Sequence, residues 1–261
     1  MDVETRRRLA DANLLARFDL TRRHVGDPRG GSARFGAVEV LAIGVDAPYF
    51  NSVFVADPAT RPEDVVAGLD WVEARGLPAM VRVLEGLDPV LRPTVEATGL
   101  TAHPLPLPVM ALAPIPAKPQ AAPPGVEIRA GRSDLFDDFH VALESDDVIR
   151  QVFGPGVIAD ADVRLAVAYL DGEPVSCGAA IRSGSTVGLY AVATIDRARR
   201  RGIGRAVSWA AIEAGREAWG GTIAVLQSSD VGLPVYRSMG FEEVAGYYLY
   251  ARPTPVPGRP V

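Results

Sequence analysis

The feature that most constrains this chain is a proline-rich stretch near its middle. Eight prolines fall within residues 103–124, HPLPLPVMALAPIPAKPQAAPP. Proline fixes φ and removes a backbone hydrogen-bond donor, so the stretch cannot be helix or central strand throughout. Residues 107–112 are apolar enough for an edge strand, whereas residues 113–125 are typical of an extended polyproline linker. We therefore expect two halves of similar length, with residues 253–261 as a disordered tail.

The composition narrows the classes of protein that this chain can belong to. Its 261 residues are 48% hydrophobic and carry a formal charge of −5, which supports packed cores and argues against a general nucleic-acid binder. No apolar run approaches the ~20 residues of a membrane span, and the first residues lack the apolar core of a signal peptide. The single cysteine, Cys177, excludes an internal disulfide and a cysteine-based zinc site. We expect a cytoplasmic protein without metal, nucleic-acid or membrane partners.

The apolar pattern of the first half predicts strands that alternate with helices. A capping-box sequence, Thr60-Arg-Pro-Glu63, predicts the start of a helix that ends at Gly76. A second helix is expected from Asp88 to Gly99. The expected strands are 38–45, 52–55, 79–84 and 107–112.

The second half is expected to repeat this alternation of strands and helices, preceded by additional strands. The dipeptide Asp171-Gly172 between two apolar runs predicts a hairpin. The expected strands are 126–129, 165–170, 175–181, 186–193, 222–227 and 243–250, and the expected helices are 133–143, 147–153, 202–219 and 233–239. An antiparallel meander followed by a strand–helix–strand crossover predicts an α/β fold with a mixed sheet and one parallel pair.

Residues 189–205, LYAVATIDRARRRGIGR, are the stretch most typical of a ligand site. An apolar strand ends there, and Gly202 and Gly204 then open a long helix. Glycine lets the backbone approach a ligand, and the free N–H groups of a helix N-terminus bind anions. Five of the 26 arginines lie in nine of these residues: Arg197, Arg199, Arg200, Arg201 and Arg205. The segment predicts a phosphate or pyrophosphate site, and the alternative is a solvated arginine cluster beside an ordinary helix start.

Two motifs in this half resemble those of a known family. The sequence Arg199-x-x-Gly202-x-Gly204 after an apolar strand resembles the Arg/Gln-x-x-Gly-x-Gly/Ala motif of the GNAT superfamily of N-acetyltransferases. Residues 235–241, VYRSMGF, are similar to the family's closing motif, in which a tyrosine precedes Gly-Phe. The resemblance covers about residues 125–250. It implies a GNAT-like fold and transfer of an acetyl group from acetyl-coenzyme A (acetyl-CoA) to an amine.

The resemblance also implies roles for individual residues. Val192 and Ala193 would end the strand that pairs with the pantetheine arm and places an N–H group near the thioester carbonyl. Tyr236 would protonate the departing thiolate, and Asp230 is a candidate contact on the pantetheine or adenine side. The pyrophosphate cradle would consist of Arg199, Arg200, Arg201, Gly202, Ile203, Gly204 and Arg205.

The general base for the acceptor amine is less clear from the sequence. Many family members use a glutamate on the strand before the cradle, but residues 186–190, TVGLY, contain no carboxylate. Acceptor-side candidates are Glu144, Asp146 and Asp147, for which a solvated face or a helix cap is the alternative interpretation. A water chain is a further alternative. His140 and Cys177 are interpreted as structural.

The first half resembles a degenerate copy of the second. Residues 79–84 and 88–100 parallel residues 222–227 and 230–241, with Val95 in the place of Tyr236. The first helix opens with Glu63 and Asp64, which would repel a pyrophosphate. We therefore expect two tandem GNAT-like copies.

The expected division is a degenerate domain at 1–112, a linker at 113–125 and a catalytic domain at 126–252. The expected acceptor is an amine on a small molecule or a peptide, and the chain would act as a monomer or homodimer. The alternatives are a non-catalytic acyl-CoA-binding or regulatory module, and a phosphate-binding module unrelated to coenzyme A.

Overall fold

The computed structural model describes residues 1–117 and 121–253, and the chain divides into two compact units. Unit 1 consists of Met1–Val25 and Pro108–Ala245. Unit 2 consists of Gly26–Leu107 and the chain from Gly246 onward. Each unit therefore combines segments from both ends of the sequence.

Unit 1 contains a mixed sheet, in which the strands β10 (Thr186–Thr194) and β11 (Ile223–Gln227) run parallel. Its strand order is β6 (Leu107–Leu112), β11 (Ile223–Gln227), β10 (Thr186–Thr194), β9 (Glu173–Ser183), β8 (Val163–Leu170) and β7 (Val126–Gly131). The long helix α7 (Ile203–Trp219) makes the crossover between β10 and β11. The mixed α/β fold class predicted from the sequence is therefore confirmed.

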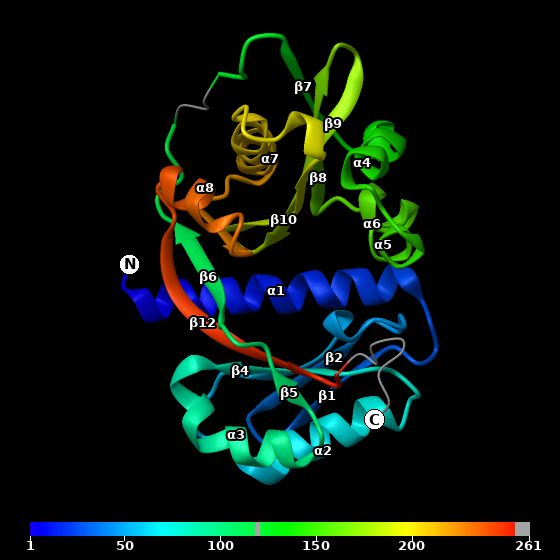
Figure 1. Ribbon diagram of the computed structural model, residues 1–261, viewed down its shortest axis with the longest axis vertical. Coiled ribbons are helices and arrows are strands. Elements are labelled where there is room, and N and C mark those ends of the chain that lie inside the picture. The colour runs from blue at the N-terminus through cyan, green and yellow to red at the C-terminus, as the bar shows by residue number, and fades with distance from the viewer. Residues whose placement is uncertain (118–120, 254–261) are drawn as a thin grey trace. The chain divides into compact units, whose positions relative to one another are not determined.

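Helices cover both faces of this sheet. Helix α7 packs against β7–β10 on one side (Figure 1). The other side holds α4 (Phe136–Leu143), α5 (Asp147–Val152) and α6 (Pro155–Ala159). The short helix α8 (Leu233–Ser238) follows β11. The core of unit 1 lies between α7, α8 and the strands, and includes Ile203, Val207, Leu189 and Phe241.

The hairpin between β8 and β9 forms where the sequence predicts it. Asp171 and Gly172 both adopt positive φ, at 53° and 81°. Two consecutive positive φ angles match the twist of the flanking strands, which is why Asp-Gly favours this turn.

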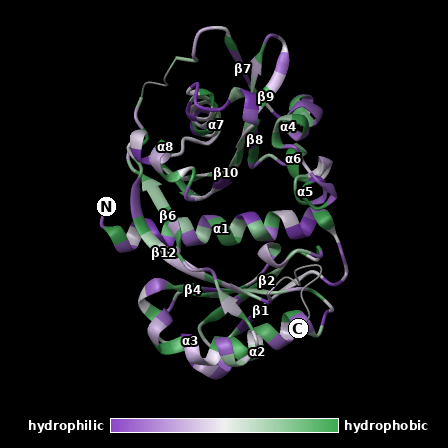
Figure 2. Cartoon of the chain, viewed as in Figure 1, coloured by the Kyte–Doolittle hydropathy of each residue, from purple (hydrophilic) through white to green (hydrophobic). Residues whose placement is uncertain are grey.

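Helix α1 (Val3–Val25) also belongs to unit 1, where it contacts β9, β10 and β11. The sequence did not indicate it, because its buried face is not apolar. Alongside Leu14 and Phe18 it buries polar and charged side chains, and Figure 2 shows hydrophilic and hydrophobic residues mixed along its length. The buried polar residues are Arg7, Asp11, Asn13, Arg17 and Thr21.

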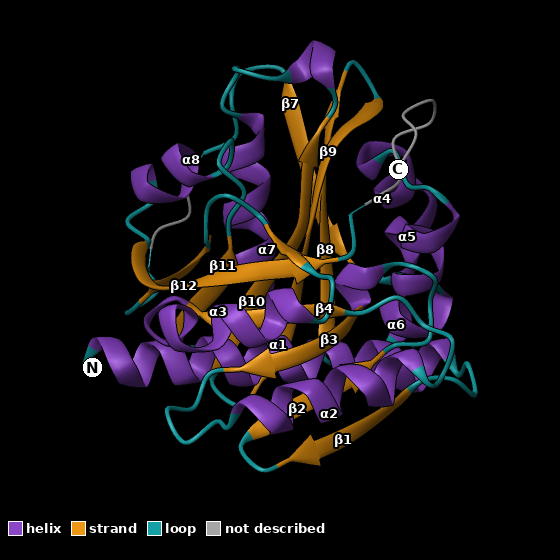
Figure 3. Cartoon of the chain, turned by 60° about the horizontal axis from the view of Figure 1, so that its bottom comes forward, coloured by secondary structure: helices purple, strands orange, loops and turns teal. Residues whose placement is uncertain are grey.

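Unit 2 repeats the strand–helix–strand arrangement on a smaller scale. Its strand order is β1 (Gly31–Phe35), β2 (Val38–Ala42), β3 (Asn51–Val55), β4 (Met80–Leu84) and β12 (Glu242–Ala251), with β5 (Thr101–Ala102) also paired to β12. Helix α2 (Pro62–Glu73) connects the parallel pair β3 and β4, and α3 (Asp88–Ala97) follows β4 (Figure 3). Its core includes Val53, Leu69, Val81 and Tyr250.

The units differ from the division expected from the sequence. Helix α1 and most of β6 come from the first half but belong to unit 1, where Leu112 pairs with Ala224. The end of β12 comes from the second half but belongs to unit 2, where Tyr250 pairs with Val81. Which strands pair with each other depends on their register and on which sheet edges are free, and closeness along the chain fixes neither.

The expected tail at 253–261 lies almost wholly outside the described residues, and residues 113–117 and 121–125 form neither helix nor strand.

The predicted capping box at the start of α2 is wrong. Arg61, not Thr60, is the N-cap residue, and it makes no side-chain cap bond. The Thr60 hydroxyl is buried without a hydrogen-bond partner. The Arg61 guanidinium instead binds the Asp64 carboxylate at 2.8 and 2.9 Å, and Pro62 occupies the first helical position.

None of the helices in the described residues combines the length and apolar character needed to cross a bilayer. Within residues 1–117 and 121–253, no group of three or more His, Cys, Asp or Glu is arranged to hold a metal ion.

Candidate active site

The parallel strands β10 and β11 separate near their carboxyl ends. Their pairing covers only Thr186–Gly188 of β10 against residues 223–225 of β11. Beyond Gly188, β10 continues to Thr194, where its recorded pairing is with β9 on the other side. Ligands of open α/β sheets bind at the carboxyl ends of strands, so this opening is the candidate active site.

A β-bulge lies in β10 beside the opening. Tyr190 pairs with Ala179 of β9, and Ala193 pairs with Cys177, so β10 holds one residue more than β9 over this interval. The extra residue coincides with Ala191, whose φ is +50°. Bulges redirect backbone and side-chain groups, often next to active sites.

Hydrogen bonds to β9 fix the carbonyl groups of this bulge. Ser176 Oγ donates to the Ala193 carbonyl at 2.6 Å, and Cys177 Sγ lies 3.5 Å from the Ala191 carbonyl. Val192 and Ala193, which the sequence resemblance assigns to the thioester end of the ligand, are half-buried here.

The predicted cradle forms the connection between β10 and α7. Arg200 and Gly202 both adopt left-handed conformations, with φ of 60° and 79°, and glycine adopts such a conformation without steric cost. Arg199 Nε donates to the Thr194 carbonyl at 2.9 Å, which holds the loop against the end of β10. Arg199, Arg200 and Arg201 are exposed.

The N-terminus of α7 is open to an anion. Gly202 is its N-cap and supplies no side-chain cap, and no acidic residue lies in the first turn. The first recorded bond at this end runs from Ala206 N to the Gly202 carbonyl at 3.1 Å. The N–H groups of Ile203, Gly204 and Arg205 precede that bond, and the helix dipole adds positive potential at this end. The chemistry of these donors fits a phosphate group.

Tyr236 lies on α8 next to this helix. Its side chain is 9% exposed and lies near Ser208 of α7. Ser208 Oγ donates to the Gly204 carbonyl at 2.7 Å. Arg205 Nη2 also donates to the Ser238 carbonyl of α8 at 3.2 Å. The structure therefore brings Tyr236 together with the first turns of α7.

Burial raises the pKa of Tyr236 to about 12. The nearby Ser208 hydroxyl opposes this shift and lowers the pKa, but burial is the larger effect. The phenol therefore stays protonated at neutral pH, as a proton donor must. Sequence reasoning missed Ser208, although a serine on the apolar face of a helix was a signal for a buried hydrogen bond.

Asp230 lies in the exposed loop between β11 and α8. Its predicted contact with the pantetheine or adenine side stays a prediction.

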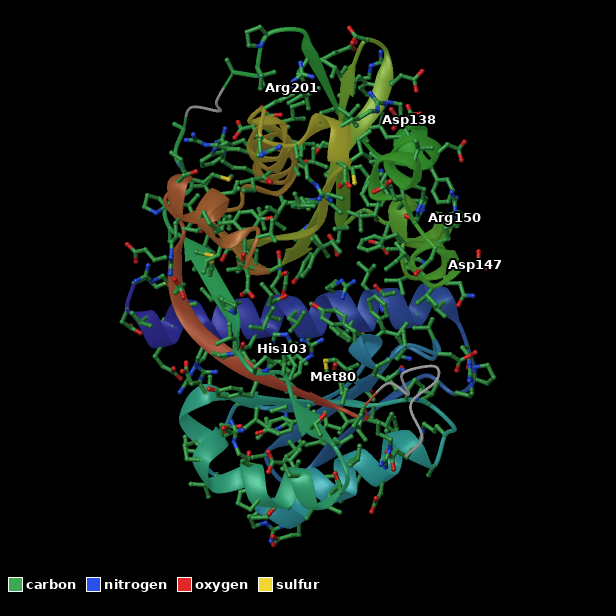
Figure 4. All side chains as sticks on the ribbon, viewed as in Figure 1. Met80, His103, Asp138, Asp147, Arg150 and Arg201 are labelled. Atoms are coloured by element: carbon green, nitrogen blue, oxygen red, sulfur yellow. The ribbon has the colours of Figure 1, made fainter. Side chains whose placement is uncertain are left out.

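The acceptor-side candidates occupy the ends of α4 and α5. Asp146 is the N-cap of α5 and accepts from Ile149 N at 2.8 Å, while exposed Glu144 ends α4 with a φ of 53°. Figure 4 shows Asp147 by α5 and Arg201 near α7, on opposite sides of strands β7–β9. These carboxylates therefore lie across the sheet from the cradle.

His140 and Cys177 are buried in unit 1 and are not poised for chemistry. His140 Nε2 lies 3.0 Å from the Phe153 carbonyl, which can only accept, so Nδ1 accepts from the Ser145 hydroxyl at 2.8 Å. Burial lowers the pKa of His140 and raises that of Cys177 to about 12. A neutral imidazole with both nitrogens bonded and a protonated thiol both suit packing roles.

The corresponding helix start in unit 2 is closed by the protein's own carboxylate. Asp64 in the first turn of α2 is 7% exposed and paired with Arg61, which lowers its pKa. A Cβ atom at Gly36 would lie 2.3 Å from Asp64 Oδ2, so the carboxylate fills that space. The absence of a cofactor loop in the first half stays a prediction.

Solved structures with similar folds cover nearly the whole chain. A GCN5-related N-acetyltransferase from Kribbella flavida matches with a TM-score of 0.71 and 21% identity over 95% of both chains. A GCN5-related N-acetyltransferase from Sphaerobacter thermophilus matches with a TM-score of 0.59 and 19% identity, covering 82% of this chain and 76% of that one. A tandem GNAT protein from the clavulanic acid biosynthesis pathway matches with a TM-score of 0.60 and 13% identity, covering 88% and 86%. These likenesses show the fold.

A comparison of the sequence with protein families matches part of the chain. A search of curated proteins gave no significant match. The family model for the acetyltransferase (GNAT) family matches residues 130–241, which span the bulged strand β10, the cradle and Tyr236. Residues 130–241 therefore form a GNAT acetyltransferase domain.

Proposed function

We propose that this chain is an acetyl-CoA-dependent N-acetyltransferase in which a primary amine attacks the thioester directly and Tyr236 acts as general acid. Three features of unit 1 support the proposal: the bulge of β10, the uncapped N-terminus of α7, which follows β10, and the buried side chain of Tyr236 on α8.

The cradle and the bulge would bind opposite ends of the reacting part of acetyl-CoA. The N–H groups of Ile203, Gly204 and Arg205 would hold the pyrophosphate, with Arg199, Arg200 and Arg201 adding positive charge. The backbone of Val192 and Ala193 would pair with the pantetheine arm and place an N–H group on the thioester oxygen. Asp230 would lie beside the pantetheine or adenine part.

During the transfer, negative charge would develop on the carbonyl oxygen of the thioester. The amine nitrogen bonds to the carbonyl carbon, and N–H groups of the bulge stabilise the charge that develops on the oxygen. As the C–S bond breaks, Tyr236 gives its proton to the sulfur. The nitrogen releases one proton, to water or to one of the acceptor-side carboxylates Glu144, Asp146 and Asp147. The phenolate then recovers a proton from solvent.

The first test removes the proposed acid. Tyr236→Phe should lower kcat about 100-fold, the low end of the usual contribution of a positioned general acid. Calorimetry should give an unchanged Kd for coenzyme A, because the phenyl ring still packs against Phe241. Turnover is measured with a panel of primary amines. Tight acetyl-CoA binding by the wild type with no transfer to any amine would contradict the proposal and favour the non-catalytic module.

The second test reverses a charge in the cradle. Arg201→Glu should weaken coenzyme A binding at least about tenfold, or about 1.4 kcal/mol. The matched control is Arg150→Glu, which changes the net charge equally at an exposed residue across the sheet (Figure 4). Equal affinities for the two variants would refute the cradle. Stabilisation by inorganic phosphate but not by coenzyme A would favour an unrelated phosphate-binding module.

A further inference from the structure

Asn13 of α1 is a fully buried amide that contacts the strand carrying the bulge. A buried amide needs partners for its donors and its acceptor, because an unpaired polar group in a protein interior is strongly unfavourable. Asn13 finds its partners on β9 and β10, more than 160 residues away along the chain.

The bonds of Asn13 assign the orientation of its amide. Asn13 Nδ2 donates to the Ile181 carbonyl at 3.1 Å and to Thr186 Oγ1 at 2.8 Å. Thr186 Oγ1 donates its own hydrogen to the Ser183 carbonyl at 2.7 Å, so toward Asn13 it can only accept. With both donors used, Asn13 Oδ1 is the acceptor for the Tyr190 hydroxyl at 2.7 Å. The Tyr190 hydroxyl therefore donates to Asn13.

Gly188 leaves the space that Asn13 fills. Residues 186, 188 and 190 share one face of β10, because alternate residues of a strand point the same way. A Cβ atom at Gly188 would lie 1.8 Å from Asn13 Oδ1 and 2.6 Å from Tyr190 Cε2. Any larger residue at position 188 would push the amide off the strand.

Tyr190 is the last paired residue of β10 before the bulge. Its hydroxyl is held by Asn13, and the guanidinium of Arg17, one turn along α1, lies 5.1 Å from the centre of its ring. Ala191 follows directly, with a φ of +50° that costs energy for a residue other than glycine. Such a conformation persists only where surrounding contacts hold it.

We propose that Asn13 is a positioning residue for acetyl transfer, which acts by fixing Tyr190 and with it the start of the bulge. This inference rests on the proposed function, in which the bulge supplies N–H groups to the thioester oxygen. Asn13 touches neither the proposed acid nor the cradle, so its loss should lower the rate of the chemical step more than the affinity for coenzyme A.

The test is Asn13→Leu, which keeps the volume of the side chain and removes its three hydrogen bonds. We expect kcat for acetyl transfer to fall about 10- to 100-fold, since a displacement near 1 Å at a reacting centre has effects of that size. The Kd for coenzyme A by calorimetry should rise by a smaller factor, because the cradle keeps its contacts with the pyrophosphate.

Leu14→Ala is the matched control. Leu14 is the next residue of α1 and is 3% exposed, so its truncation loosens the packing of the helix without touching the Asn13 bonds. Leu14→Ala should lower Tm at least as much as Asn13→Leu and leave kcat near that of the wild type. Equal losses of kcat in the two variants would overturn the proposal, because they would trace the effect to general destabilisation.

Two further variants test the route through Tyr190. Gly188→Ala should reproduce the loss of kcat of Asn13→Leu. Tyr190→Phe combined with Asn13→Leu should lower kcat no further than Asn13→Leu alone, because both changes remove the same bond. Multiplied losses in the double variant, or full activity of Gly188→Ala, would overturn the proposal.

Amide hydrogen exchange at Val192 and Ala193 provides a readout that does not depend on activity. Asn13→Leu should accelerate exchange there, and Leu14→Ala should not.

If the wild type transfers no acetyl group, the proposed function fails, and so does the role of Asn13 in catalysis. If the wild type is active but exchange and kcat are unchanged in Asn13→Leu, the positioning role alone fails.

Discussion

At the scale of single residues, environment decides which polar groups of unit 1 suit chemistry. Tyr236 and Cys177 are both buried, and burial raises the pKa of each to about 12. A high pKa preserves a phenol as a proton donor but keeps a thiol from acting as a nucleophile. The same physical effect therefore favours Tyr236 as an acid and disfavours a covalent acetyl-cysteine route.

The raised pKa of Tyr236 predicts how the folded protein responds to alkaline pH. The unfolded chain releases this proton near pH 10, whereas the folded chain holds it to about pH 12. The stabilisation is complete below pH 10 and is lost as pH rises toward 12. In a spectrophotometric titration, the difference in absorbance between the wild type and Tyr236→Phe should show no tyrosinate signal at pH 10. A full tyrosinate signal at that pH would contradict the buried hydroxyl.

Cys177 should be inert while the protein is folded. It is 0% exposed, and its thiol lies against the Ala191 carbonyl. A chromogenic disulfide reagent at pH 8 should therefore react only after denaturant is added. Stoichiometric labelling of the native protein would show that the strand β9 opens or that the thiol is accessible.

At the scale of elements, each unit contains segments from both halves of the chain, so the fold of each unit depends on both halves. In unit 2, Tyr250 of β12 donates a hydrogen bond to Asp88, which begins α3 and is 3% exposed. Arg92 binds the same carboxylate at 2.6 and 3.0 Å. A residue near the C-terminal end of the described chain thus anchors a helix of the first half.

Removal of this anchor should destabilise the protein. Tyr250→Phe leaves a buried oxygen of Asp88 without its donor, which should lower the free energy of unfolding by about 1–3 kcal/mol. Tyr248→Phe is the control, because Tyr248 is half-buried on the same strand and has no recorded hydroxyl bond. Urea unfolding followed by circular dichroism measures both variants. Equal stabilities would show that the Tyr250–Asp88 bond contributes nothing.

At the scale of the whole molecule, the two units cannot be separated at the linker that the sequence suggests. A fragment of residues 126–261 contains the family-matched residues 130–241 but lacks α1 and β6 of unit 1. It would expose the edge of β11 that pairs with β6, and the faces of β9 and β10 that α1 covers.

We therefore expect residues 126–261 alone to show no cooperative thermal unfolding and no coenzyme A binding. Co-expression with residues 1–117 should restore both, because the missing elements are then supplied in trans. Size-exclusion chromatography and calorimetry provide the measurements. Cooperative unfolding and wild-type affinity of the isolated fragment would show that the family domain is autonomous.

The sequence alone determined the order of most elements and the position of the candidate cradle. Gly202, Gly204 and the arginines around them predicted the cradle, because a positive φ and a helix N-terminus are local properties that residue type fixes. Asp171-Gly172 predicted its hairpin for the same reason. The strands and helices expected from residue 38 onward all formed, with shifts at their ends. The structure adds the short strand β5 and the short helix α6, which the sequence did not indicate.

Only the tertiary structure decided which elements form each unit and which buried polar groups meet. Asn13 and Tyr190 are 177 residues apart, and neither lies in a recognisable motif. Helix α1 escaped sequence reasoning because polar and charged residues share its buried face with Ala10, Leu14 and Phe18 and obscure the apolar period. Strand partners and buried polar pairs depend on register and packing between distant segments, and a local pattern of residues does not encode these directly.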